Sequence, residues 1–315
     1  MSAMTALVPL DGTKLSESAF ALLPLIRKLG FDKVVLVGVW EGLWQGDNLG
    51  RADAELNELA EKGRAYLQAY LEEQARGVRP LGLEVDVDVR VGRAAEQLLE
   101  AANQTDLILI ATHGRDGIAR WRLGSVADQV VRHANCPTLV IGPNVQIDLA
   151  PYAVQRILVP LDGSALAEEA LPVATWLAQT TGAELDLVRV VSLVIPGNGI
   201  YDGMGYSVDL LTDIEDAARA YLAGVAEKLK DKVVTVRTEM LLGAAGDQLL
   251  AHMKDSPAHL AVLASHGRSG VIRAALGSVA DRMLHGPAPV LVLRPEQVKS
   301  KIMEAAMSAD EASPA

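Results

Sequence analysis

Short runs of valine, leucine and isoleucine alternate with longer stretches of mixed polarity along this chain of 315 residues. The short runs are apolar almost without interruption, which is typical of parallel strands that helices cover on both faces. The longer stretches have the length and composition of helices. The regular alternation of the two kinds of segment predicts an α/β fold built on a doubly wound parallel sheet.

The pattern predicts five strands in each half of the chain. In the first half we expect strands near residues 5–10, 33–40, 83–91, 106–111 and 138–142, and helices near residues 14–29, 52–76, 93–103 and 124–134. In the second half we expect strands near residues 156–161, 184–191, 233–241, 259–264 and 289–293.

The same motifs return in the second half of the chain. Residues 7–13 (Leu-Val-Pro-Leu-Asp-Gly-Thr) correspond to residues 158–164 (Leu-Val-Pro-Leu-Asp-Gly-Ser), and residues 137–141 (Pro-Thr-Leu-Val-Ile) correspond to residues 289–293 (Pro-Val-Leu-Val-Leu). The offset between the halves stays between 151 and 153 residues. A constant offset of this size means that the repeating unit is a whole domain and not a short solenoid module.

We therefore predict two tandem domains, at residues 1–145 and 152–295, joined by a short linker that contains Pro151. Residues 296–315 are rich in alanine, serine, glutamate and lysine. We predict that they form a disordered tail with one helical turn around residues 298–303.

The aliphatic fifth strand of each copy bears on assembly. At the edge of an isolated domain it would expose unpaired backbone groups beside apolar side chains. We expect the two fifth strands to pair with each other, so that the chain forms an internal pseudo-dimer. The sequence leaves open whether two such chains associate further into a homodimer.

Charge and composition narrow the range of partners. The chain has a formal net charge of −11 and is 50% hydrophobic. We expect no binding to nucleic acid or to anionic membranes, since both need a basic face. Neither a signal-peptide pattern nor about eighteen consecutive apolar residues occurs, so we expect no membrane span. The single cysteine, Cys136, excludes an intrachain disulfide and fits a reducing, cytoplasmic location.

A second repeated motif carries the candidate chemistry. Residues 111–115 (Ala-Thr-His-Gly-Arg) and 124–128 (Gly-Ser-Val-Ala-Asp) correspond to residues 264–268 (Ala-Ser-His-Gly-Arg) and 277–281 (Gly-Ser-Val-Ala-Asp). Nine residues separate the His-Gly glycine from the Gly-Ser pair in each copy. A glycine loop that leads into a helix start presents unpaired backbone N–H groups and the positive end of the helix dipole, and both suit a phosphate group.

The serines of this motif have two interpretations. Ser125 and Ser278 can bind phosphate through their hydroxyls, or they can be plain N-caps while Gly114 and Gly267 serve turns. The duplication alone does not decide between the two, because a structural motif is copied as readily as a functional one.

Asp11 and Asp162 end the first predicted strand of each copy. Each carboxylate can accept both hydroxyls of a ribose, or it can cap the helix that follows. In open α/β sheets, ligands bind beyond the carboxyl ends of strands where the winding reverses. If the first and fourth strands are neighbours, Asp11 and Gly114 lie at opposite ends of one cleft.

These motifs resemble those of the universal stress protein family, over residues 4–143 and 155–295. ATP-binding members of that family carry Gly, two residues, Gly, nine residues and then Gly-Ser or Gly-Thr. The resemblance implies a five-stranded parallel sheet in the order 3-2-1-4-5 in each copy. The chain departs from the pattern at the first glycine, which is Ala111 or Ala264. If that position needs a positive φ, alanine costs roughly 1–2 kcal/mol; if it needs only a small residue, the backbone N–H survives.

The resemblance also implies a site for ATP, or another adenine nucleotide, accompanied by Mg²⁺. The aspartates would meet adenosine, the valines that close the second strands would meet adenine through their backbone, and the glycines and serines would hold phosphates. The site residues of the first copy are Asp11, Val39, Ala111, Gly114, Arg115, Gly124 and Ser125. Those of the second copy are Asp162, Val190, Ala264, Gly267, Arg268, Gly277 and Ser278.

Other residues near the motif stay open between two roles. His113 and His266 can contact phosphate or fix the loop by a hydrogen bond. Arg115 and Arg268 can pair with phosphate or face water. The glycine-rich residues 196–207 can form a lid or a long connection.

Three functions remain open from the sequence. The first is an adenine-nucleotide-binding regulator of a stress response, with slow hydrolysis at most. The second is a nucleotide-free scaffold or interaction module. The third is an ATP-hydrolysing or adenylyl-transferring enzyme, for which the sequence shows no catalytic base, no Walker Gly-Lys-Ser/Thr motif and no G-x-S-x-G motif.

Overall fold

The computed structural model describes residues 4–42, 53–112, 123–146, 152–192, 208–233, 235–265, 276–294 and 301–311. The strands of the first copy are β1 (Met4–Pro9), β2 (Phe31–Trp40), β3 (Glu84–Val91), β4 (Leu107–Ala111) and β5 (Thr138–Ile141). Those of the second copy are β6 (Arg156–Pro160), β7 (Glu184–Val191), β8 (Val236–Leu242), β9 (Leu260–Ala264) and β10 (Val290–Leu293).

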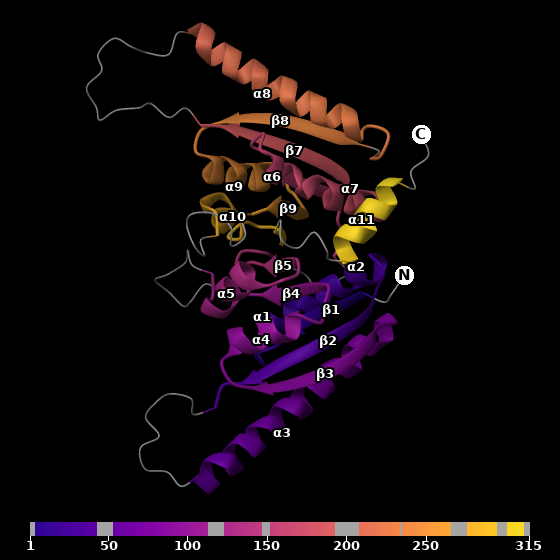
Figure 1. Ribbon diagram of the computed structural model, residues 1–315, viewed down its shortest axis with the longest axis vertical. Helices are drawn as coiled ribbons and strands as arrows, with labels where there is room; N and C mark the ends of the chain where they lie inside the picture. The colour runs from indigo at the N-terminus through magenta and orange to yellow at the C-terminus, as the bar shows by residue number, and fades with distance from the viewer. Residues whose placement is uncertain are drawn as a thin grey trace, which may run out of the picture.

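The helices follow the same plan in both copies (Figure 1). The first copy holds α1 (Lys14–Glu17), η1 (Ser18–Leu22), α2 (Leu23–Lys28), α3 (Asp53–Val78), η2 (Arg79–Leu81), α4 (Ala94–Ala102) and α5 (Ser125–His133). The second holds α6 (Ala165–Glu168), α7 (Ala170–Thr181), α8 (Val208–Leu229), α9 (Ala245–Asp255) and α10 (Ser278–Met283), and α11 (Lys301–Glu311) follows it.

The described strands form one ten-stranded sheet in the order β3-β2-β1-β4-β5-β10-β9-β6-β7-β8. Each copy therefore has the predicted order 3-2-1-4-5, and its strands are parallel. The expected α/β architecture is confirmed. The winding reverses between β1 and β4 in the first copy and between β6 and β9 in the second, which places a ligand crevice at those two positions.

Apolar side chains cover both faces of the sheet because successive strand residues point to opposite sides. In β4, Ile108 and Ile110 join a buried cluster with Leu98 of α4 and Val130 of α5. The residue between them, Leu109, joins a second cluster on the other face. Uninterrupted apolar strands are the sequence signature of this two-sided burial.

The copies meet where β5 and β10 pair antiparallel, with Leu139 opposite Leu291. This is the pairing of fifth strands that the exposed aliphatic edges led us to expect. Just beyond it the two sides differ. Arg294 donates from Nη2 to the carbonyl of Val131 (2.6 Å), whereas its counterpart Gly142 lies so close to the copy-two backbone that a Cβ would stand 2.1 Å from the Leu284 carbonyl oxygen.

Two predictions were wrong. The single helix expected at residues 14–29 is divided into α1, η1 and α2, and Pro24 lies in the first turn of α2, where its missing N–H does no harm. The tail expected to be disordered contains α11, whose Ile302 and Ala306 are 2% exposed and lie one turn apart on the face that packs on α7. Figure 1 shows α11 beside α7 and near α2, at the junction of the copies.

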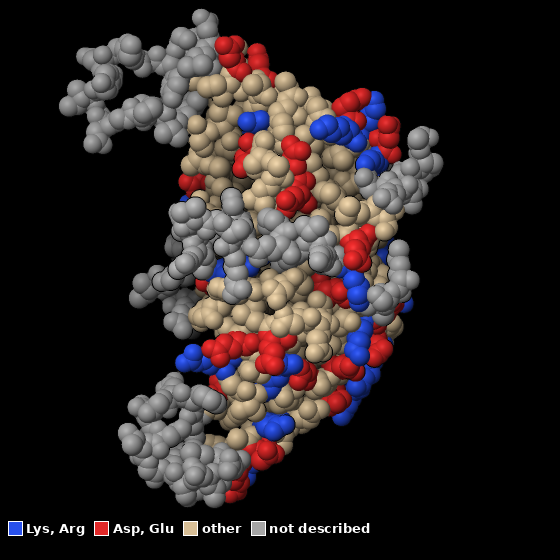
Figure 2. Space-filling model, viewed as in Figure 1, with Lys and Arg blue, Asp and Glu red and all other residues tan. Residues whose placement is uncertain are grey.

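Charged side chains of both signs intersperse on the surface seen in Figure 2, including over β3 and α4. Several are paired: Lys33 contacts Glu84 (2.9 Å) and Asp86 (2.6 Å), and Arg90 contacts Asp88 (2.7 Å). Exposed pairs of this kind contribute little to stability, because water screens their charges. In the described part of the chain, no helix combines the length and apolarity needed to cross a membrane.

Candidate functional site

Each copy has a cleft at the carboxyl ends of its strands, at the position where the winding reverses. We call them cleft one, about 350 Å³, and cleft two, about 240 Å³. Ten of the predicted site residues line these clefts. In cleft one they are Asp11, Val39, Ala111, Gly124 and Ser125. In cleft two they are Asp162, Val190, Ala264, Gly277 and Ser278.

The remaining predictions fall outside the described residues. These are Gly114, Arg115, Gly267 and Arg268, together with His113, His266 and the glycine-rich segment at 196–207. Among the residues that are described, no group of three or more His, Cys, Asp or Glu could hold a metal ion.

The carboxylate that follows the first strand organises a turn and does not itself cap the helix. Asp11 accepts at Oδ1 from the backbone N–H of Thr13 (3.0 Å), and Thr13 is the N-cap of α1. In the second copy Asp162 accepts at Oδ1 from the N–H of Ser164 (2.8 Å), and Ser164 caps α6. The glycine between them, Gly163, has a φ of 88°, a left-handed conformation that favours glycine. The capping alternative for the two aspartates is therefore wrong.

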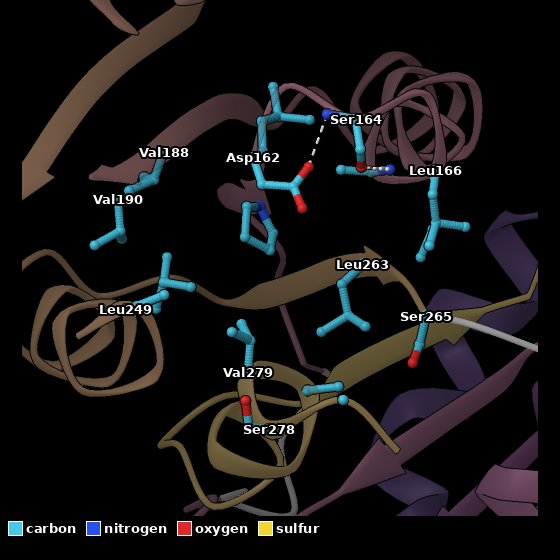
Figure 3. A pocket seen from close by; sticks show the side chains of 17 residues that line it. Asp162, Ser164, Leu166, Val188, Val190, Leu249, Leu263, Ser265, Ser278 and Val279 are labelled. Atoms are coloured by element: carbon cyan, nitrogen blue, oxygen red, sulfur yellow. Dashed lines mark hydrogen bonds between the residues drawn. The ribbon is translucent and has the colours of Figure 1, made fainter. Parts of the chain in front are cut away.

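Figure 3 shows how cleft two is arranged. Asp162 stands on one side and the start of α10, with Ser278, on the other. Val188 and Val190 of β7 close one end, and Ser265 follows β9 at the other. The cleft is thus apolar along the strands and polar at two opposed helix starts, which is typical of sites that bind a ligand with an apolar body and charged groups.

The pKa of Asp162 is lowered although burial, the largest single influence, acts to raise it. Hydrogen bonds from Ser164 and the charge of Arg189 outweigh the burial. The Arg189 guanidinium lies 3.3 Å from where a Cβ of Gly163 would stand and 4.8 Å from the centre of the Tyr221 ring. Its counterpart in the first copy is Gly38, so this cation belongs to copy two alone.

The start of α5 does not use its serine as a cap. The N-cap is Gly124, without a side-chain hydrogen bond, and Ser125 is the first helical residue. The second copy repeats this with Gly277 and Ser278 at the start of α10. The N-cap interpretation of the two serines is wrong, and both side chains are exposed at their clefts.

The alanines that replace the first glycine of the motif sit in regular strands. Ala111 ends β4 opposite Ile141, and Ala264 ends β9 opposite Leu293. A strand residue has a negative φ, so alanine brings no backbone strain here. The alternative in which this position needs a positive φ is excluded.

Sequence reasoning missed several polar groups at the clefts. In cleft one, Thr112 accepts at Oγ1 from the N–H of Gly124 (3.0 Å), and Glu41 accepts at Oε1 from the N–H of Ala94 at the start of α4 (2.8 Å). In cleft two, Ser265 takes the place of Thr112. The sequence could have pointed to Thr112 and Ser265, because both belong to the repeated motif. It gave no indication of Glu41, because the repeat does not preserve this residue: the corresponding position of copy two is Ser192.

A buried polar pair was also missed, deeper in copy two. His252 of α9 lies 2.7 Å (Nε2) from Asp186 Oδ2 of β7, and its Nδ1 lies 3.6 Å from Glu239 Oε2. His252 is 7% exposed and Asp186 3%. The hydrogen bond to Asp186 is the main reason that the pKa of His252 is raised above 6.5.

Known proteins share this architecture. The model of the Universal stress protein family matches residues 3–142 and 153–294. Universal stress protein Rv2005c of Mycobacterium tuberculosis is 32% identical over 202 residues, which cover 62% of this chain and 64% of that relative, less than two thirds of its length. Universal stress protein Rv1996 of the same organism is 26% identical over 252 residues, 77% of this chain and 78% of the relative.

The fold is shared with solved structures. The crystal structure of a universal stress protein from Archaeoglobus fulgidus DSM 4304 covers 93% of this chain and 99% of its own, with a TM-score of 0.67 at 20% identity. A likeness at that identity shows the fold alone.

Proposed function

Because the chain belongs to the universal stress protein family, we propose that it is an adenine-nucleotide-binding regulator of a stress response, with ATP as its ligand. Turnover of the nucleotide, if any, is slow in this proposal, since the described cleft residues include no base paired with a nucleophile. In this proposal, binding of the nucleotide changes the surface through which the protein contacts its partners. The two copies together act as a sensor of the nucleotide.

One observation carries the proposal. In each copy an aspartate, a Gly-Ser helix start and a small strand-ending residue, far apart in sequence, line a single cleft at the reversal point of the sheet. Reversal points are where open α/β sheets bind nucleotides. Free N–H groups at a helix start favour phosphate. The nine-residue spacing matches that of the ATP-binding members described above.

The side chains suggest how an adenine nucleotide would lie. Asp162 directs a carboxylate into cleft two, opposite Ser278. A carboxylate is a good acceptor for ribose hydroxyls, and a serine hydroxyl beside backbone N–H groups is a good donor to phosphate. We propose that the ribose lies against Asp162 and the phosphates against Ser278, with Mg²⁺ entering on the phosphate chain.

The test is the nucleotide content of freshly purified protein, released by denaturation and identified by mass spectrometry. We expect an adenine nucleotide at one or two equivalents per chain, and depletion of it in the double variant Ser125→Ala with Ser278→Ala. Protein that carries no nucleotide and shows no thermal shift at millimolar ATP would contradict the proposal.

A second function is favoured by one observation, the internal pairing of polar groups in cleft one. A cleft whose donors are already satisfied suits a scaffold that needs no nucleotide. Thermal melting that is indifferent to ATP, combined with retention of protein partners, is the outcome expected of that alternative.

A further inference from the structure

The polar groups of cleft one are paired with each other. The N–H of Gly124, at the start of α5, donates to Thr112 Oγ1 (3.0 Å). The N–H of Ala94, at the start of α4, donates to Glu41 Oε1 (2.8 Å). A ligand that entered cleft one would have to displace these two internal acceptors before it could use either N–H group.

The counterparts in cleft two do not form these two internal pairs. Ser265, in the place of Thr112, is only 6% exposed, and its hydroxyl makes no hydrogen bond with any residue in the described part of the chain. Ser192, in the place of Glu41, donates instead to the Gly243 carbonyl (2.8 Å) and does not line cleft two. Within the same described ranges the N–H groups of Gly277 and Ala245 also have no acceptor.

The Ser265 hydroxyl, which has no internal partner, can bond a ligand in the cleft without first breaking a hydrogen bond within the protein. Ser265 lines cleft two, and Figure 3 shows its hydroxyl directed toward the side of the cleft where α10 begins. The start of α9, an eleven-residue helix, contributes Ala245 to the same cleft. Cleft two therefore offers hydrogen-bond donors that cleft one has already used.

The charged groups at the two clefts also favour binding of an anion in cleft two. Glu41 adds a second carboxylate to Asp11 in cleft one. Cleft two holds Asp162, with the guanidinium of Arg189 beside its turn. An anionic ligand meets less repulsion in cleft two.

We propose that cleft two is the high-affinity site for a phosphate-bearing ligand and that Glu41 and Thr112 hold cleft one in a self-paired state of lower affinity. The carboxylate of Glu41 acts there as a built-in substitute for an anionic ligand at the start of α4. This inference rests on the proposed function for its ligand, an adenine nucleotide, and adds which copy binds it.

The first test is calorimetric titration of the full chain with ATP and Mg²⁺, which should give about one tight site per chain. Ser265→Ala removes the unpaired hydroxyl and should weaken that site roughly tenfold. The matched variant Thr112→Val alters the same position of cleft one and should change the tight site by less than about twofold.

The second test exchanges the residues that distinguish the clefts. Glu41→Ser gives copy one the residue of copy two and should raise the number of sites from one toward two. Ser192→Glu makes the reverse exchange and should weaken the tight site about tenfold. Circular dichroism confirms that each variant is folded.

The outcomes separate the two proposals. Two sites of equal affinity, or equal effects of Ser265→Ala and Thr112→Val, would overturn the division between clefts and leave nucleotide binding intact. If ATP does not bind but tripolyphosphate does, with the Ser265→Ala dependence, the division stands and the nucleotide proposal falls. If neither probe binds, both proposals are wrong.

Discussion

The two copies solve the same packing problem with different pairs of residues. In copy one, Gly38 of β2 lies beneath Leu67 of α3, and a Cβ on Gly38 would come within 2.8 Å of that leucine. The counterparts in copy two are Arg189 of β7 and Ala218 of α8. The large side chain has moved from the helix to the strand. At these two positions the copies differ by a paired exchange of volume, because a single exchange would overpack the site or leave a cavity.

A second exchange involves polarity. Copy one has Val35 on β2 and Ala101 on α4, where copy two has Asp186 and His252. The buried pair is compatible with folding because each partner satisfies the other. The comparison predicts that either solution is stable and that mixtures of the two are not.

Among the variants that disturb these copy-specific contacts, His252→Ala should have the largest effect on stability. It leaves Asp186 buried without its partner and should lower the free energy of unfolding by about 3–5 kcal/mol. Urea denaturation followed by circular dichroism measures it. The double variant Asp186→Val with His252→Ala installs the copy-one solution and should recover most of the loss. Equal destabilisation of the single and double variants would show that the pair is not coupled.

Gly142→Ala comes next. A methyl group at this position would lie 2.1 Å from the Leu284 carbonyl oxygen, so the junction of the copies must shift, at a cost of about 1–3 kcal/mol. The melting temperature should fall accordingly. Gly224→Ala, inside α8, is the matched control: nothing lies within 4 Å of its added methyl, and alanine suits a helix interior, so this variant should lose no stability. A Gly142→Ala protein as stable as the control would argue that the junction is loosely packed.

The same buried pair predicts a smaller, pH-dependent effect. The pKa of His252 is raised above 6.5 by Asp186, with Glu239 adding to the effect and Arg156 opposing it. The folded protein therefore binds this proton more tightly than the unfolded chain does. The stabilisation is complete below about pH 6.5 and is lost as the pH rises through the raised pKa.

The measurement is the free energy of unfolding between pH 5 and pH 9 for the wild type and the Asp186→Val, His252→Ala double variant. The wild type should lose stability relative to the double variant as the pH rises. A difference that stays constant across this range would mean that His252 does not titrate with folding.

Arg189→Ala should have the smallest effect. It removes the stacking on Tyr221, worth about 0.5–1 kcal/mol at a partly exposed position. It also removes a charge that lowers the pKa of Asp162, so that carboxyl should titrate at higher pH, as followed by NMR. Arg219→Ala, on the surface of α8, is the control and should leave Asp162 unchanged. An unchanged Asp162 titration in Arg189→Ala would contradict the assignment.

The sequence was sufficient for those features that depend on local pattern or on the repeat. Uninterrupted aliphatic runs identified the strands, and the strand order followed from the resemblance carried by the Gly-Ser motif. The repeat also placed Asp11 and Asp162, together with the Gly-Ser helix starts, at the clefts.

The sequence could not predict contacts between distant residues when those contacts occur in one copy only. His252 and Asp186 are 66 residues apart, and Glu41 and Ala94 are 53 apart. Each pair occurs in one copy only, so the repeat gave no indication. The helix α11 was missed because its buried face consists of only a few apolar residues in a polar segment. Packing against α7 stabilises this helix, and the local sequence does not reveal that contact.

The junction of β5 with β10 has a consequence for how the molecule can evolve. In a symmetric dimer of separate chains, every substitution at the axis appears on both sides at once. In this chain the two sides are encoded separately, so Gly142 and Arg294 can occupy corresponding positions of one interface. Covalent linkage also makes the association intramolecular, with an effective concentration that does not fall on dilution. The fusion thereby frees one copy to specialise while the other keeps the partnership intact.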